Sequence, residues 1–201
     1  RTRYEAWFDK HYEAYISELL AIRTHVPLTG LGLEIGVGTG RFASPLGIEV
    51  GIDPCKEMAR TAAERGINVV EGIAESLPFY DNSFDFVLIV TTICFVDSPV
   101  KMLVETSRVL KPEGKLIIGF IDRESFMGQQ YETHKAENVF YKDATFYSAT
   151  EIEKLLKTSN FNITDWTQTL SHSLQETHSI EAAQIGRGQS AFVVVVACNK
   201  K

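Results

Sequence analysis

The stretch of sequence that decides the fold is Leu33-Glu34-Ile35-Gly36-Val37-Gly38-Thr39-Gly40-Arg41. It follows a short apolar run with the length of a strand and leads into a helix. Glycines at alternate positions let the backbone turn sharply and let a ligand approach the main chain without meeting a Cβ atom. The following helix N-terminus would offer free N–H groups to an anionic group. A tight strand-to-helix connection without a ligand is the alternative interpretation.

A carboxylate at the end of the next predicted strand favours the ligand-binding interpretation. Val50-Gly51-Ile52-Asp53-Pro54 places Asp53 where nucleotide-binding folds accept hydrogen bonds from ribose hydroxyls. Asp53 is also suited to cap the helix that starts near Lys56, and one carboxylate can serve both roles. A dinucleotide fingerprint requires G-x-G-x-x-G, but Arg41 stands at its last position and Gly40 comes one residue early. The spacing therefore favours another ligand.

Strand-like and helix-like segments alternate along most of the chain. Apolar residues recur at helical spacing from Tyr4 to Ile22, and Pro27 and Gly30 end that helix. The predicted strands are Leu31 to Ile35, Glu49 to Ile52, Asn68 to Val70, Phe84 to Val90 and Lys115 to Ile121. The predicted helices between and after them are Lys56 to Arg65, Pro99 to Leu110 and Ala149 to Thr158. Such alternation implies parallel strands joined by crossover helices.

The tail departs from this alternation. Asn162 to Leu170 and Ala191 to Cys198 are two strand-like runs without a helix between them, which suggests an antiparallel pair at the sheet edge. We therefore predict an α/β fold: a doubly wound, mostly parallel, seven-stranded sheet with helices on both faces and an antiparallel C-terminal edge pair.

Overall composition limits the class of protein. The chain of 201 residues is 44% apolar, which fits one domain over residues 1–201. Its net charge of -6 argues against nucleic acid as a partner. No apolar run is long enough to span a membrane. The scattered cysteines Cys55, Cys94 and Cys198 indicate reduced thiols, a cytoplasmic location and no metal site.

Several segments together resemble the class I (Rossmann-like) S-adenosylmethionine-dependent methyltransferases, particularly their small-molecule branch. The glycine stretch resembles the family's first motif, and Asp53 matches the residue that binds ribose. Residues 72–79 resemble the adenine-side loop, residues 81–85 open the fourth strand, and residues 108–116 resemble the turn before the fifth strand. The resemblance implies S-adenosylmethionine as cofactor, bound by Glu34, Gly36, Gly38, Gly40, Asp53, Pro54, Ala74, Glu75, Val90 and Thr91.

One residue and two segments depart from the family pattern. Ile73 stands where the adenine loop commonly carries an acid, so adenine recognition would rest on the backbone at Ala74 and on Glu75. Thr91 to Val96 replace the paired histidines that many relatives show after the fourth strand. Because only Arg41 to Gly47 separate the glycine turn from the second strand, the first crossover helix must be unusually short.

An acceptor pocket is expected above the cofactor, where ligands bind beyond the carboxyl ends of the strands. We expect three segments to build it: the N-terminal aromatic helix, residues 122–147 and the loop 171–190. The chain would then divide into an N-terminal helical cap (1–27), a cofactor-binding core (31–121) and an acceptor-side and C-terminal strand region (122–201). Tyr12, Phe95, Tyr131 and His134 are the candidate substrate contacts. Aromatic residues at 126, 131, 140, 141, 146 and 147 suggest a flat or apolar acceptor, or simply the packing of a lid.

The favoured function is methyl transfer to a small molecule. The chemistry rests mainly on orientation, so none of the five histidines is singled out as a general base and the catalytic residues stay unassigned. A protein that binds the cofactor without turnover would explain the missing base and Ile73. A nicotinamide oxidoreductase is the weaker alternative, because the glycine spacing opposes it. We also expect the N-terminal helix to close over the cofactor. The sequence indicates no oligomeric state.

Overall fold

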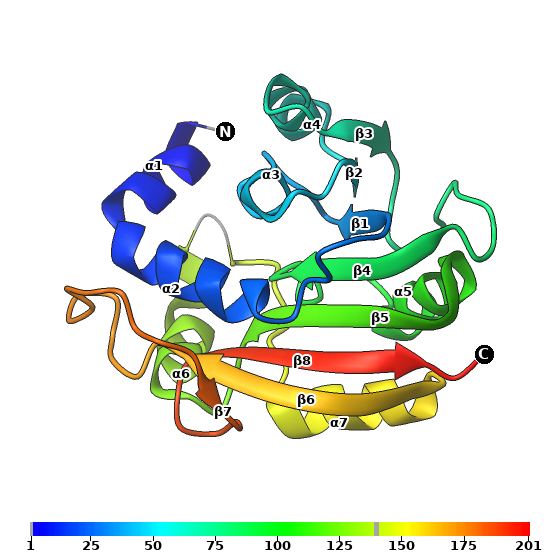
Figure 1. Ribbon diagram of the computed structural model, residues 1–201. Coiled ribbons are helices and arrows are strands. Elements are labelled where there is room, and N and C mark those ends of the chain that lie inside the picture. Colours follow the sequence, from blue (N-terminus) through cyan, green and yellow to red (C-terminus); the bar gives the residue numbers. More distant parts are fainter. Residues whose placement is uncertain (1, 139–140) are drawn as a thin grey trace.

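Five parallel strands form the half of the sheet that carries the glycine turn. The structure is a computed structural model that describes residues 2–138 and 141–201. Its parallel strands are β1 (Gly32–Ile35), β2 (Val50–Asp53), β3 (Asn68–Glu71), β4 (Phe84–Val90) and β5 (Leu110–Ile121). They lie in the order β3-β2-β1-β4-β5 (Figure 1). The order reverses between β1 and β4, and ligands of such sheets bind beyond the strand ends at that point.

The C-terminal strands complete the sheet in antiparallel fashion. β8 (Phe192–Asn199) lies between β5 and β6 (Phe161–Thr169), antiparallel to both. This arrangement confirms the predicted antiparallel pair. The predicted count of seven strands is wrong, because β7 (Gln184–Ile185) adds an eighth strand at the edge of β6. With two residues, β7 is too short to produce an alternating pattern in the sequence.

Helices cover both faces of the sheet (Figure 1). On one face lie α1 (Thr2–Lys10), α2 (Tyr12–Arg23), α3 (Ala43–Leu46) and α4 (Lys56–Glu64). On the other face lie α5 (Pro99–Val109) and α7 (Ala149–Thr158). Alternate residues of β4 enter the two cores, since Phe86 and Leu88 point to the first and Val87 and Ile89 to the second. The doubly wound prediction is therefore confirmed.

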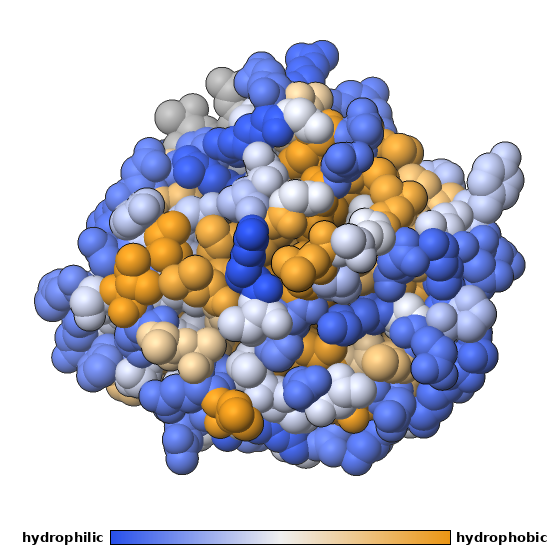
Figure 2. All heavy atoms as spheres, in the orientation of Figure 1, coloured by the Kyte–Doolittle hydropathy of each residue, from blue (hydrophilic) through white to orange (hydrophobic). Residues whose placement is uncertain are grey.

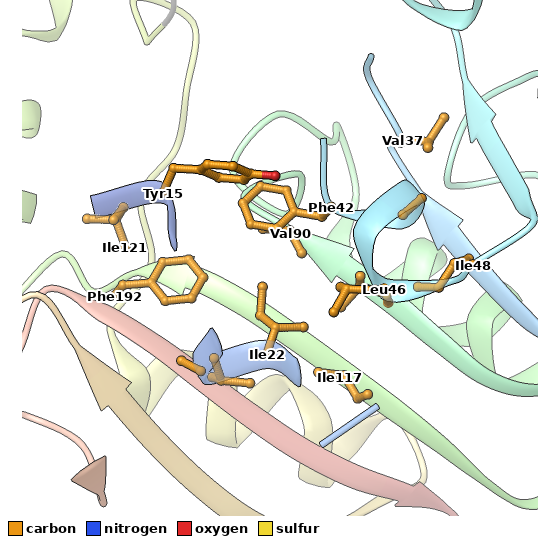
Figure 3. Close-up of a cluster of buried hydrophobic side chains, with 14 of the residues drawn as sticks. Tyr15, Ile22, Val37, Phe42, Leu46, Ile48, Val90, Ile117, Ile121 and Phe192 are labelled. Carbon is orange, nitrogen blue, oxygen red and sulfur yellow. The ribbon is translucent and has the colours of Figure 1, made fainter. Parts of the chain in front are cut away.

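The core beneath α2 joins the N-terminal helices to the C-terminal strands. Figure 3 shows Tyr15 and Ile22 of α2 beside Phe42 and Phe192, which come from the segment before α3 and from β8. The Tyr15 and Phe42 rings lie 5.5 Å apart in an edge-to-face arrangement, which suits the quadrupoles of aromatic rings. This packing fixes α2 against the sheet and so positions the segment that precedes it.

The N-terminal segment differs from the single helix expected over Tyr4 to Ile22. The helix is interrupted at His11, whose φ of −118° and ψ of 46° are not helical. As a result α1 and α2 have separate buried faces. On α2 the buried positions are Ala14, Tyr15, Ser17, Glu18, Ala21 and Ile22.

The length of one helix, the start of one strand and two further helices can also be compared with the predictions. The first crossover helix, α3, has only four residues, as its short connection predicts. β5 starts at Leu110, five residues earlier than expected at Lys115. Beyond the carboxyl end of β5 the chain forms α6 (Phe126–His134) and a turn of 3-10 helix (Lys135–Glu137), neither of which the sequence predicts.

No helix in the described parts of the chain has the length and apolar character to cross a bilayer. The cytoplasmic location stays a prediction.

Candidate functional site

All three glycines of the turn after β1 adopt backbone conformations that L side chains rarely take. Their φ angles are +72° at Gly36, +53° at Gly38 and +78° at Gly40. A Cβ atom on Gly36 would clash with the Thr92 side chain, and one on Gly40 would clash with Ile67. A Cβ on Gly38 would lie 3.3 Å from the Tyr4 hydroxyl. The turn is thus closely surrounded and depends on glycine at each position.

The amides of the turn are largely used within the protein. Gly36 N–H and Val37 N–H donate to the Ile52 carbonyl over 2.8 and 3.0 Å, and Gly40 N–H donates to the Val37 carbonyl over 2.8 Å. The amide groups of Gly36, Val37 and Gly40 are therefore not free to bind a ligand. The turn can therefore contact a ligand by close packing of its backbone more than by donating hydrogen bonds. This suits a ligand without a pyrophosphate.

Asp53 connects the turn to the end of β2. One of its carboxylate oxygens accepts from Gly38 N–H over 2.8 Å, and the other accepts from Cys55 N–H over 2.8 Å. The second bond resembles a helix cap before α4, so the capping interpretation is compatible with the structure. A carboxylate has further acceptor capacity after these two bonds, which leaves room for ligand hydroxyls.

Glu34 is an almost fully buried acid beneath the turn, with 2% of its surface exposed. Its Oε2 atom has no hydrogen-bond partner among the described residues. Burial raises the pKa of the Glu34 carboxyl well above its usual value, a hydrogen bond from the Ala43 backbone opposes this, and the Asp53 charge adds to it. A ligand group that donates hydrogen bonds or carries positive charge would satisfy this oxygen.

A cavity of about 180 Å³ lies at the carboxyl ends of β1 to β4. Its wall brings together residues that are far apart in sequence: Gly36, Ile52, Pro54, Gly72, Ile73, Ala74, Glu75, Thr92, Phe95, Val96 and Asp97. We call it the turn cavity. One oxygen of Glu75 accepts from Ser98 N–H over 3.1 Å, so this acid also fixes the start of α5. The predicted contacts Gly36, Pro54, Ala74 and Glu75 therefore share one cavity.

A larger cavity of about 400 Å³ lies next to the turn cavity, and Phe95 belongs to both walls. Its described lining residues are Tyr4, Trp7, Phe8, Glu18, Phe42, Thr91, Phe95, Ile121, Met127, Tyr131, Asn138, Tyr141 and Leu174. We call it the aromatic cavity. All three segments that the sequence suggested for an acceptor pocket contribute to it. In Figure 2 apolar residues gather over the middle of the face that α1 to α4 cover, within a mostly hydrophilic rim.

Other predicted site residues lie elsewhere. Tyr12 is 53% exposed. His134 is exposed on α6, and its Nδ1 atom lies 3.0 Å from the Gln130 carbonyl. Neither residue lines the aromatic cavity as described. Val90 is buried in the core beneath α2 and lines neither cavity as described. Phe126 is 65% exposed, and Phe140 falls outside the described residues. None of the five histidines lines the aromatic cavity.

Several carboxyl groups lie near Tyr4 in the wall of the aromatic cavity. Burial raises the pKa of the Tyr4 hydroxyl, and the charges of Glu34 and Asp53 raise it further. Thr91, at the end of β4, lines the aromatic cavity with a φ of +50°, a strained conformation for a β-branched residue. Because the carboxyl groups of Glu5, Glu18, Glu34 and Asp53 all lie near the Tyr4 hydroxyl, the site favours a cationic ligand over an anionic one.

Sequence reasoning missed Glu18, which lies in the wall of the aromatic cavity. The missed signal is its spacing: Ala14, Glu18, Ala21 and Ile22 lie on one face of α2, so an acid occupies the face that the helix buries. This face becomes apparent only when the break at His11 is known.

Comparisons with known proteins agree with this geometry. A family model described as a methyltransferase domain matches residues 33–118, the span from β1 into β5. An uncharacterised protein of Methanocaldococcus jannaschii is 47% identical over 194 residues, which cover 96% of this chain and 94% of that protein.

Solved structures extend the comparison to the whole chain. A SAM-dependent methyltransferase of Thermotoga maritima, described as a possible histamine N-methyltransferase, is 48% identical, with a TM-score of 0.96 over 99% of this chain and 96% of its own. A putative methyltransferase of Haloferax volcanii in complex with the Trm112 activator has a TM-score of 0.75 at 17% identity, covering 100% of this chain and 95% of its own, and shows the fold alone. The chain therefore belongs to the class I, Rossmann-like family of S-adenosylmethionine-dependent methyltransferases.

Proposed function

We propose that this enzyme transfers the methyl group of S-adenosylmethionine to a small molecule held in the aromatic cavity. The observation that carries the proposal is the pair of adjoining cavities at the glycine turn, with Phe95 in the wall of both. Methyl transfer needs the cofactor and the acceptor side by side. Two adjoining cavities support such an arrangement.

The residues around the turn fit the cofactor. Glu34 Oε2, buried and without a partner among the described residues, would accept from the amino group of the methionine moiety. Asp53 would bind the ribose hydroxyls, and Ala74 and Glu75 would lie on the adenine side of the turn cavity. The cofactor supplies a methyl group that its sulfonium makes electrophilic. The nearby carboxylates favour this positive charge.

The aromatic cavity fits an acceptor of small size. Its volume of about 400 Å³ lies in the range of small-molecule sites, and apolar and aromatic side chains form most of its described wall. Such a wall would orient the acceptor and exclude water from the reacting atoms. The relative from Thermotoga maritima, described as a possible histamine N-methyltransferase, supports an acceptor of this size.

The proposed function divides the chain into the three parts that the sequence predicted. Residues 31–121 would hold the cofactor, residues 1–27 would cover it, and residues 122–201 would complete the acceptor side. Tyr4, Trp7 and Phe8 of α1 and Met127 and Tyr131 of α6 support this division, because they face one cavity.

Calorimetric titration with S-adenosylhomocysteine and with NADH tests the cofactor. We expect micromolar binding of the first and no binding of the second; the reverse result would favour the nicotinamide alternative. Transfer of labelled methyl groups is then measured with panels of small amines, phenols and thiols, and with protein and RNA. Labelling of a macromolecule but of no small molecule would contradict the proposed acceptor class, and binding without any transfer would favour the non-catalytic alternative.

A further inference from the structure

Glu18 is the only acid in the described wall of the aromatic cavity, and that wall contains no lysine or arginine. The side chain comes from the buried face of α2, and 5% of the residue's surface is exposed. Within residues 2–138 and 141–201, no hydrogen bond or ion pair reaches its carboxyl group. Burial raises the pKa of Glu18 to about 8. An acid in such surroundings gains most from a ligand that carries positive charge or donates a hydrogen bond.

Three aromatic rings in the wall of the same cavity are arranged as a stack. Tyr131 and Tyr141 have ring centroids 4.9 Å apart with 28° between their planes, and Phe95 and Tyr141 have centroids 6.1 Å apart with 10° between theirs. Nearly parallel rings present flat faces, which bind flat apolar groups and attract cations.

We propose that Glu18 binds the nitrogen of the methyl acceptor, and that the acceptor is a small amine with a flat apolar body. This proposal rests on the proposed function, because it assigns the acceptor of the same site. The carboxyl group would recognise the nitrogen, while the ring stack would hold the flat part of the molecule. Neutral alcohols of the same shape would lack the charge that Glu18 selects.

The same group would make the amine reactive. Glu18 as a carboxylate takes a proton from the acceptor's ammonium group, which leaves a lone pair on nitrogen. That lone pair forms the N–CH3 bond as the S–CH3 bond breaks, and the electron pair of the broken bond stays on sulfur. The sulfonium becomes a neutral thioether and the positive charge moves to nitrogen. Glu18 keeps this proton when the product leaves, as it does in the free protein at pH 7, and releases it to water when the next ammonium group binds.

Titratable groups around Glu18 are mainly tyrosines. Tyr4, Tyr131 and Tyr141 share its cavity, and Tyr15 lies on the same helix. Burial raises the pKa of all four hydroxyls, so they stay protonated at neutral pH. Among these neighbours Glu18 is therefore the group that changes its protonation between pH 7 and 9.

The test is calorimetric titration of the protein, saturated with S-adenosylhomocysteine, with phenethylamine and with 2-phenylethanol. The two probes have the same shape, but only the first is a cation. Titration in phosphate and in Tris at pH 7 gives the number of protons released on binding. Glu18→Gln is compared with Glu13→Gln, the same change on a half-buried residue of α2 that lines neither cavity as described.

We expect the wild-type protein to bind phenethylamine at least tenfold more tightly than 2-phenylethanol and to release close to one proton per site at pH 7. Glu18→Gln should lose the preference and the proton release while its affinity for S-adenosylhomocysteine changes by less than twofold. Glu13→Gln should behave as wild type. Proton release from the wild-type protein should shrink toward pH 9, which tests the proposal even if Glu18→Gln fails to fold.

An unchanged amine preference in Glu18→Gln, or failure of the wild-type protein to bind phenethylamine, would overturn the proposal. Loss of S-adenosylhomocysteine affinity with the amine preference retained would place Glu18 at the cofactor instead. If S-adenosylhomocysteine does not bind the wild-type protein, the proposed function fails. The amine titration on the ligand-free protein then still decides whether Glu18 recognises a cation.

Discussion

Glu5 on α1 forms an ion pair with Arg41, the residue that directly follows the glycine turn. Glu5 Oε2 lies 2.5 Å from Arg41 Nη2 and 3.0 Å from Arg41 Nε. Arg65 adds a second donor to the same oxygen over 2.7 Å. Glu5 and Arg41 side chains are each 22% exposed, so solvent screens the pair only in part. The ion pair thus fastens the N-terminal helix to the segment that would hold the cofactor.

Replacing Glu5 with Gln is expected to weaken binding of S-adenosylhomocysteine about fivefold to thirtyfold, since charge-assisted hydrogen bonds of this kind contribute about 1–2 kcal/mol. Although partial burial raises the pKa of Glu5, hydrogen bonds led by those of Arg65 lower it to about 2. The pair is therefore complete above about pH 4.5 and is lost as the pH falls toward 2. Calorimetry at pH 7 measures the affinity, with Glu13→Gln as control. Unchanged affinity would show that α1 does not cover the cofactor.

Alanine at Gly40 should destabilise the fold more than alanine at Gly47. The two residues have similar φ angles, +78° and +73°, so the backbone strain of about 1–2 kcal/mol is shared. A Cβ on Gly47 meets nothing within 4 Å, whereas one on Gly40 would clash with Ile67 and lie 3.3 Å from Ala62. Overpacking should add about 1–3 kcal/mol at Gly40. Urea unfolding of the two variants measures the difference, and equal losses would argue against close packing of the turn on α4.

Asp53→Asn should lower the affinity for S-adenosylhomocysteine about tenfold to a hundredfold. An amide of the same size cannot accept from both Gly38 N–H and Cys55 N–H, so one bond of about 1.5–3 kcal/mol is lost. The turn would then shift at the point where ribose is expected to bind. Asp165→Asn on β6, an exposed acid outside both described cavity walls, is the matched control. Equal affinities for the two variants would remove Asp53 from the proposed site.

Much of the fold is predictable because its signals are local. β4 and α7 have the bounds that the sequence predicts. A short apolar run and an amphipathic stretch each mark the ends of their element by their own residue pattern. α3 is short because few residues connect β1 to β2. The break at His11 is different: residues on both sides continue a helical spacing, and Trp7 before it and Tyr15 after it both pack at the core beneath α2, so no change in the apolar pattern marks the break.

The candidate site is predictable where the backbone alone creates it. Gly36 and Asp53 are fixed by turn and strand ends, so sequence position suffices. Whether the side chains of Glu18, Tyr12 and His134 face the cavity depends on how their helices are rotated about their axes. α6 has little amphipathic character, so nothing in its sequence shows that Tyr131 faces the cavity and His134 faces outward.

Glu18→Gln should change how the stability of the protein depends on pH. In the folded protein burial raises the pKa of Glu18 to about 8 from the ordinary value of 4.5. Between these values the folded state keeps a proton that the unfolded state has lost, so wild-type stability falls as the pH rises from 4.5 and levels off above 8. The full loss is at most about 4–5 kcal/mol.

Glutamine carries no charge in either state and removes this part of the slope, while Glu34 titrates in both proteins and cancels in the comparison. Urea unfolding at pH 5.5 and at pH 8.5 should therefore show Glu18→Gln close to wild type at the lower pH and clearly more stable at the higher one. Parallel curves for the two proteins would mean that Glu18 is ionised and solvated in the folded chain, and its assignment as a buried proton acceptor would then fail.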